Sequence, residues 1–118
     1  MLHHVALETR VEDVEACVAF FALLGFARVE PPETLSDRAV WLTFGDQQIH
    51  LLLTDDPEVP PRGHVALVLD DYDAALTRLV VAGYDVQPRT QHWGSPRAFV
   101  RDSPGHVVEV MKFPPPSD

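Results

Sequence analysis

The sequence is poor in cysteine, basic residues and long apolar runs, and each shortage excludes a class of protein. A single cysteine, Cys17, rules out an intramolecular disulfide framework. No apolar run approaches the ~20 residues that a membrane-spanning helix needs, so we expect no membrane partner. The chain enters a strand-like pattern at residues 1–4 without a basic leader, which makes a cytoplasmic location the default expectation.

Basic side chains are outnumbered by acidic ones. Nine Lys and Arg residues stand against 18 Asp and Glu, for a formal net charge of −9. Such a surface repels a phosphate backbone and anionic lipids, so we expect no nucleic-acid partner. With 118 residues, of which 46% are hydrophobic and 23% charged, the composition is typical of a globular chain. Its length suits one compact domain or two half-size modules.

The first half of the sequence recurs in the second half. Four landmarks return in the same order, at offsets of 58 to 60 residues: 4–7 as 64–67, Gly25-Phe26 as Gly83-Tyr84, Arg38-Ala39 as Arg97-Ala98, and 49–51 as 108–110. Identity between the halves is sparse, but the conserved order of the landmarks indicates a duplication.

Each half predicts the same series of elements. Period-two alternation indicates strands and 3.6-residue spacing indicates helices. The first half predicts a strand at 4–7, a helix at 12–24 and strands at 26–30, 38–44 and 48–53. The second predicts a strand at 64–69, a helix at 71–82 and strands at 84–87, 97–101 and 107–113.

We therefore expect an α+β fold built as one domain over residues 1–118. Two tandem βαβββ modules would form a curved mixed sheet around a cavity, with the helices on the outer face. Module 1 spans about 1–54 and module 2 about 64–113. A proline-rich linker at 55–63 joins them, and a tail at 114–118 follows.

Four polar side chains fall at equivalent places in the two modules. Because side chains alternate along a strand, His4, His50, His64 and Glu109 point away from the helices, into the concave face. Burying an imidazole or carboxylate without a partner is costly, and a divalent cation removes that cost for all four. Imidazole and carboxylate suit Zn, Ni, Fe, Mn or Co. The pattern predicts a site for such an ion, with open positions for two substrate oxygens.

The remaining histidines and aromatic residues are given other roles. His3 has the opposite parity to His4, and His92 and His106 fall in a loop and a turn, where solvated side chains are the ordinary case. Trp93, beside His92, is a candidate wall of the substrate pocket. Trp41 is expected in the core, and Cys17 is expected to be a buried small hydrophobe.

At these residues the chain resembles the vicinal oxygen chelate superfamily, which includes glyoxalase I, bleomycin-resistance proteins and extradiol dioxygenases. The matching stretches are residues 2–7, Leu24-Gly25-Phe26, 63–67 and 102–109, the last similar to that family's D-P-x-G-x-x-x-E hairpin. The resemblance implies paired βαβββ modules around a metal, with His4, His64 and Glu109 at ligand positions. His50 stands where glyoxalase I has a glutamate.

The resemblance also implies roles beyond the metal. Arg97, Phe99 and Arg101 would approach the cavity, with Arg97 as an anchor for an anionic or carbonyl substrate. The chain would form a homodimer, with each site built either within one chain or across two chains.

The leading functional expectation is a divalent-metal-dependent, glyoxalase-like enzyme of the lyase or isomerase type. It would act on a small molecule chelated through two oxygens, with Glu109 as the catalytic proton carrier. One alternative is a non-haem iron extradiol-type dioxygenase, suggested by the two-His-one-carboxylate subset. A second alternative is a metal-free, drug-sequestering protein similar to the bleomycin-resistance proteins.

Overall fold

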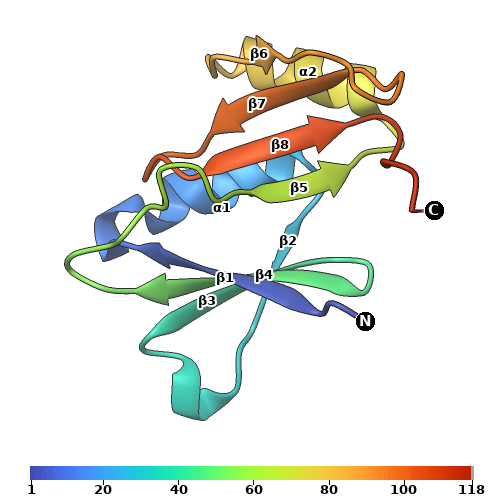
Figure 1. The fold of residues 1–118 in the computed structure, drawn as a ribbon. Coiled ribbons are helices and arrows are strands. Elements are labelled where there is room, and N and C mark those ends of the chain that lie inside the picture. Colours follow the sequence, from blue (N-terminus) through green and yellow to red (C-terminus); the bar gives the residue numbers. More distant parts are fainter. Residues whose placement is uncertain (118) are drawn as a thin grey trace. The chain divides into compact units, whose positions relative to one another are not determined.

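The computed structural model describes residues 1–117, which form two units of the βαβββ type (Figure 1). Unit 1 comprises residues 1–61 together with 102–106, and unit 2 comprises residues 62–101 together with those from 107 onward. Each unit holds one four-stranded mixed sheet. The predicted α+β class and the duplicated βαβββ order are therefore confirmed.

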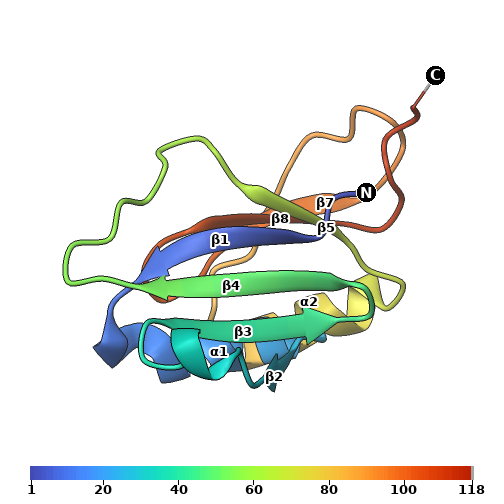
Figure 2. The same cartoon turned by 90° about the horizontal axis from the view of Figure 1, so that it is seen from below.

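Unit 1 contains one four-stranded sheet and one α-helix. Its elements are β1 (His4–Thr9), α1 (Val14–Leu23), β2 (Ala27–Val29), β3 (Ala39–Phe44) and β4 (Gln47–Leu53), with short 3-10 helices η1 (Val11–Asp13) and η2 (Glu33–Leu35). The strand order is β1-β4-β3-β2, which can be followed in Figure 2. The pair β1 and β4 is parallel, and the other pairs are antiparallel.

Unit 2 repeats this topology. Its elements are β5 (Val65–Val68), α2 (Tyr72–Val81), β6 (Gln87–Pro88), β7 (Arg97–Arg101) and β8 (Val107–Met111). The strand order is β5-β8-β7-β6, with β5 and β8 parallel and the remaining pairs antiparallel. A duplication produces two sheets with the same strand order and the same relative strand directions.

Each helix buries one face. In α1 the buried side chains include Cys17, as predicted, together with Phe20 and Phe21. In α2 Leu79 is buried, whereas the adjacent Val80 is 60% exposed. Adjacent helical residues lie about 100° apart, so the face occupied by Leu79 leaves Val80 toward solvent.

The central strand of each sheet is its most buried part. All five residues of β8 are buried, as are Ile49, His50 and Leu51 in β4. Both strands pair with a parallel neighbour on one side and an antiparallel neighbour on the other. A polar side chain in the middle of such a strand is held rigidly and shielded from water.

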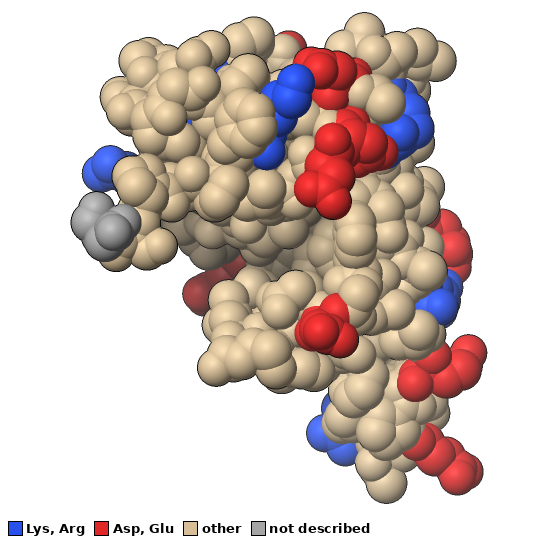
Figure 3. Space-filling model, turned by 90° about the vertical axis from the view of Figure 1, so that its right-hand side faces the viewer, with Lys and Arg blue, Asp and Glu red and all other residues tan. Residues whose placement is uncertain are grey.

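Within the described residues, no helix is long and apolar enough to cross a membrane. On the face shown in Figure 3, acidic side chains form several separate patches and basic side chains lie singly among them, in keeping with the net charge of −9.

Candidate metal centre

His50 and Glu109 occupy the same place in their respective sheets. His50, in β4, lies opposite Ala6 of β1 and Trp41 of β3. Glu109, in β8, lies opposite the equivalent alanine of β5 and Phe99 of β7. Each polar residue therefore stands on the central strand between a small residue and an aromatic one. The register agrees with the equivalence inferred from the sequence repeat.

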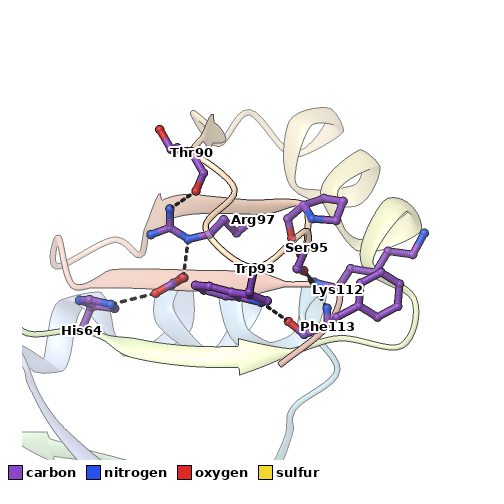
Figure 4. A network of polar contacts seen from close by, with 9 residues as sticks. His64, Thr90, Trp93, Ser95, Arg97, Lys112 and Phe113 are labelled. Atoms are coloured by element: carbon purple, nitrogen blue, oxygen red, sulfur yellow. Dashed lines mark hydrogen bonds and ion pairs between the residues drawn. The ribbon is translucent and has the colours of Figure 1, made fainter. Parts of the chain in front are cut away.

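In unit 2 the carboxylate of Glu109 contacts two basic side chains, one at each oxygen (Figure 4). His64, which immediately precedes β5, places Nε2 3.0 Å from Oε1. Arg97, at the start of β7, donates from Nε to Oε2 at 2.8 Å. Glu109 is 6% exposed, whereas the side chain of His64 is 31% exposed, so the carboxylate is buried and the imidazole lies at the surface.

Two opposing influences act on the pKa of Glu109. Burial raises it, because a low-dielectric environment disfavours the charged form. The hydrogen bonds and positive charges of Arg97 and His64 lower it, and their combined effect is larger, so the pKa ends below its ordinary value. Glu109 is therefore a carboxylate at neutral pH, which is the form that ligates a metal ion.

Both ring nitrogens of His64 face oxygen atoms. Nδ1 lies 2.9 Å from the backbone carbonyl of Arg62, and Nε2 lies 3.0 Å from Oε1 of Glu109. Each of these oxygens only accepts hydrogen bonds, whereas a neutral imidazole has a single N–H to donate. A neutral ring therefore donates at only one of these two contacts, and the tautomer decides which one. A ring that donates from Nδ1 to the carbonyl keeps its Nε2 lone pair, as is usual for a metal-bound histidine.

In unit 1 the other two predicted ligands lie against each other. The rings of His4 and His50 stack with centroids 4.0 Å apart, and Trp41 stacks on His50 at 4.2 Å. His50 Nε2 lies 2.7 Å from the side-chain oxygen of Gln48. His3, whose parity predicted a place on the helix side or at the surface, is exposed, and its Nδ1 lies 3.0 Å from Nδ1 of His4.

The surroundings of His50 keep its ring neutral. Burial lowers the pKa of His50, and the nearby His4 and His3 lower it further, because protonation of one imidazole disfavours protonation of the next. A neutral imidazole offers the lone pair that a metal ion requires. Unit 1 thus contains the imidazole nitrogens of His4 and His50, and unit 2 separately contains the imidazole of His64 and the carboxylate of Glu109.

A family model for the Glyoxalase/Bleomycin resistance protein/Dioxygenase superfamily matches residues 1–110. The chain belongs to this superfamily. No curated protein matches it.

Several solved structures resemble the chain over nearly its whole length. A Bacillus anthracis protein described as a glyoxalase family member is 25% identical, with a TM-score of 0.84 over 94% of this chain and 93% of that one. Lactoylglutathione lyase from Agrobacterium tumefaciens is 23% identical, with a TM-score of 0.71 over 94% and 92%. The oxidase ChaP-H2 is 20% identical, with a TM-score of 0.76 over 99% and 96%. The latter two share the fold.

Three of the residues predicted to bind substrate, Arg97, Trp93 and Phe99, lie together beside Glu109. Besides its bond to Glu109, Arg97 donates to the carbonyl of Thr90 at 2.6 Å and lies over the rings of Trp93 and Phe99, 5.7 and 5.5 Å from their centroids. Trp93 is itself fixed by a 2.9 Å bond from Nε1 to the carbonyl of Phe113 (Figure 4).

A small cavity opens beside this cluster. Its volume is about 150 Å³, and its lining includes Phe99 and Arg101. Phe99 also lies 5.2 Å, centroid to centroid, from His64. Phe99 therefore lies beside the His64–Glu109 pair and also lines a space large enough for a small molecule.

The four predicted donors have the chemistry of ligands to a divalent ion, but the structure groups them as two pairs. Among residues 1–117, no three His, Cys, Asp or Glu side chains are gathered as a metal site. The structure brings His4 to His50 and His64 to Glu109. Neutral imidazole nitrogens and an ionised carboxylate are the donors that Zn, Ni, Fe, Mn and Co accept.

One histidine that was predicted to be solvated is buried. His106 was predicted to be solvated in a turn, but it is 3% exposed and its Nδ1 lies 2.7 Å from Oδ2 of Asp102. The prediction was wrong because the turn places the carboxylate of Asp102 beneath the ring. A D-x-x-x-H spacing across a turn was the available signal. His92, by contrast, is exposed as expected.

Proposed function

We propose that this glyoxalase-superfamily chain is a divalent-metal-dependent enzyme of the lyase or isomerase type. His4, His50, His64 and Glu109 would ligate the ion. The substrate would be a small molecule that presents two vicinal oxygens. Bound in this way, a divalent ion acts as a Lewis acid toward those oxygens.

The observation that carries the proposal is the placement of His64 between two acceptors. Nδ1 lies 2.9 Å from the Arg62 carbonyl and Nε2 lies 3.0 Å from Oε1 of Glu109. With the ring proton on Nδ1, the Nε2 lone pair would lie beside the carboxylate, and a divalent ion would bind both groups. The neutral ring of His50 adds a further nitrogen donor to the set.

The other side chains of the cluster have roles that follow from their contacts. Arg97 holds Oε2 of Glu109, so this carboxylate stays oriented when Oε1 releases His64. Oε1 is then the atom that takes a proton from a carbon beside a substrate carbonyl and returns it. Trp93 and Phe99 exclude water from this exchange, and Arg101 beside the cavity attracts an anionic substrate group.

The first test is elemental analysis of untagged protein purified without chelator. We expect about one divalent ion per chain in the wild type and in the His92→Ala control, which removes an exposed loop histidine. The His64→Ala variant should lose the ion. A fully metallated His64→Ala variant would refute the ligand assignment. Iron as the bound element, with oxygen uptake on catechol-like compounds, would move the reaction to an extradiol-type dioxygenase.

A metal-free binding protein is the rival function, and one observation favours it. Glu109 already has two basic partners, so with His64 protonated the cluster is a complete ion-pair network. A wild-type protein that is purified without metal and takes up none of the five candidate ions would make this chain a ligand-sequestering protein. In that case the cavity beside Phe99 would hold the ligand directly.

We also propose that the chain is a homodimer, which sedimentation analysis tests. Mixing His4→Ala and Glu109→Ala subunits distinguishes sites built within one chain from sites built across two. If each site draws on two chains, the mixed dimer regains one intact ligand set and binds metal. If each site lies within one chain, no intact set exists and the mixture stays metal-free.

A further inference from the structure

Arg89 lies on the same face of the unit 2 sheet as Glu109. Its backbone N–H donates to the carbonyl of Arg97 at 3.0 Å, which continues the pairing of β6 with β7 by one residue. In that pairing Gln87 is opposite Phe99, and in the next pairing Phe99 is opposite Glu109. Residues opposite each other share a face, and side chains alternate along a strand. Arg89 therefore lies on the face that carries Phe99 and Glu109.

The side chain of Arg89 lies over the ring of Phe99. Its guanidinium carbon is 4.8 Å from the ring centroid, which is a cation–π contact. The same ring lies 5.2 Å, centroid to centroid, from the imidazole of His64. Phe99 therefore holds the guanidinium of Arg89 beside the pair of His64 and Glu109.

The two arginines at this ring differ in their hydrogen bonds. Arg97 donates to Oε2 of Glu109 and to the carbonyl of Thr90, so it finds its acceptors within the protein. Within the described part of the chain, no oxygen accepts a hydrogen bond from the side chain of Arg89, and no carboxylate pairs with it. The ring of Phe99 has no oxygen or nitrogen to offer. The N–H donors of Arg89 are therefore open to a ligand, and a guanidinium presents them as a fork that a carboxylate fits.

The charge at this place differs from that of the chain as a whole. The net charge of −9 repels an anion from most of the surface, so an anionic ligand needs local positive charge. The carboxylate of Glu109 is already matched by Arg97 and His64. The side chain of Asp85 precedes β6, whereas Arg89 follows it, and it accepts a hydrogen bond from a glutamine. Arg89 thus adds a positive charge that no acidic side chain offsets.

We propose that Arg89 determines substrate specificity by binding a carboxylate, so that the substrate is a carboxylic acid that also carries the two vicinal oxygens. The position of the vicinal oxygens rests on the proposed function, whereas the carboxylate contact requires only Arg89 and Phe99. The carboxylate accepts two hydrogen bonds from the guanidinium, and the apolar part of the ligand packs on the half-buried ring of Phe99. Arg97, the anchor expected from the resemblance, orients Glu109 instead.

Isothermal titration with two matched probes tests the role of Arg89. One probe, 3,4-dihydroxybenzoate, carries vicinal oxygens and a carboxylate, and the other, 3,4-dihydroxybenzamide, carries the same oxygens and a neutral amide. We expect the wild type to bind the benzoate at least about tenfold more tightly than the benzamide. Arg89→Gln should lose this preference and keep its affinity for the benzamide. The control Arg38→Gln, at an exposed arginine of unit 1, should keep the preference.

Titrations with chelator and with Zn²⁺, an ion without redox chemistry, separate this inference from the proposed function. If Zn²⁺ strengthens the binding of both probes but the wild type does not prefer the benzoate, the inference is overturned and the metal centre stands. If the preference is present and Zn²⁺ changes nothing, Arg89 binds the carboxylate and the metal centre fails. An Arg89→Gln variant that keeps the preference, or a wild type that binds neither probe, also overturns the inference.

Nuclear magnetic resonance locates the contact. In the ¹⁵N-labelled wild type, the side-chain Nε–H signal of Arg89 is assigned by its absence from Arg89→Gln. This signal should shift on addition of the benzoate and move less on addition of the benzamide. The corresponding signal of Arg38 should stay in place with both probes. Equal shifts at Arg38 and Arg89 would mean that the anion is attracted nonspecifically, and this result would overturn the inference.

Discussion

Replacement of Arg97 by methionine tests whether the Glu109 cluster is held by charge. The side chains of Arg97 and Glu109 are 12% and 8% exposed, and their 2.8 Å contact is thus shielded from solvent. Methionine has a similar length but leaves one oxygen of a buried carboxylate without its partner. Breaking a buried ion pair in this way costs about 3 kcal/mol or more. For a chain of this size the corresponding fall in Tm is roughly 10–15 °C.

The measurement is urea unfolding of Arg97→Met at neutral pH with chelator present, so that metal binding does not contribute. The matched control is Arg38→Met, because Arg38 is the counterpart of Arg97 in the sequence repeat and is exposed. An exposed substitution of this kind changes stability by about 0.5 kcal/mol at most. If Arg97→Met loses no more than Arg38→Met, then Glu109 is not held by this ion pair and the argument on its pKa is wrong.

Three further predictions concern single residues. The wild type should be more stable than Glu109→Gln, and this difference should be complete above the unfolded pKa of Glu109, near 4.5. The difference should disappear as pH falls through the lowered pKa of the folded state. Urea unfolding midpoints of both proteins across pH measure it, and a difference in stability that persists in acid contradicts the prediction. Burial raises the pKa of Cys17, so a thiol reagent should label the folded protein slowly and the urea-unfolded protein fast, and equal rates would contradict the burial. Both Gly25 and Gly83 have positive φ (105° and 94°), so alanine is strained at either position. Gly25→Ala should lower the stability more than Gly83→Ala, because only at Gly25 would the added methyl group collide with the ring of Phe44. Thermal melts of the two variants compare them directly.

Much of the fold could be predicted from the sequence because the duplication supplies each signal twice. Period-two alternation at 97–101 predicted β7 with its observed bounds. The second strand of unit 2 was predicted at 84–87, whereas the structure has only β6 at Gln87–Pro88. Two residues pair with the edge of β7 there, and so short a pairing leaves no periodic pattern in a sequence.

The alternation of side chains along the strands predicted which residues are candidate donors, but not which side chains contact them. Alternation places His50 and Glu109 on one face of a strand, and nothing more than the period is needed for that. The contacts of Glu109 with Arg97 and of His50 with Trp41 depend on the register between strands, which hairpin spacing alone does not define. The pairing of Asp102 with Cys17 joins residues 85 positions apart, beyond any local pattern.

Unit 1 is made of two separate stretches of chain, and this has a consequence for biosynthesis. Its last members, residues 102–106, follow most of unit 2 in the sequence. During synthesis Cys17 therefore meets its partner Asp102 only after the chain has grown by 85 further residues. Unit 1 reaches its final packing only after most of unit 2 has been made, so residues 1–61 expressed alone should lack the contact between Cys17 and Asp102 and the packing around it.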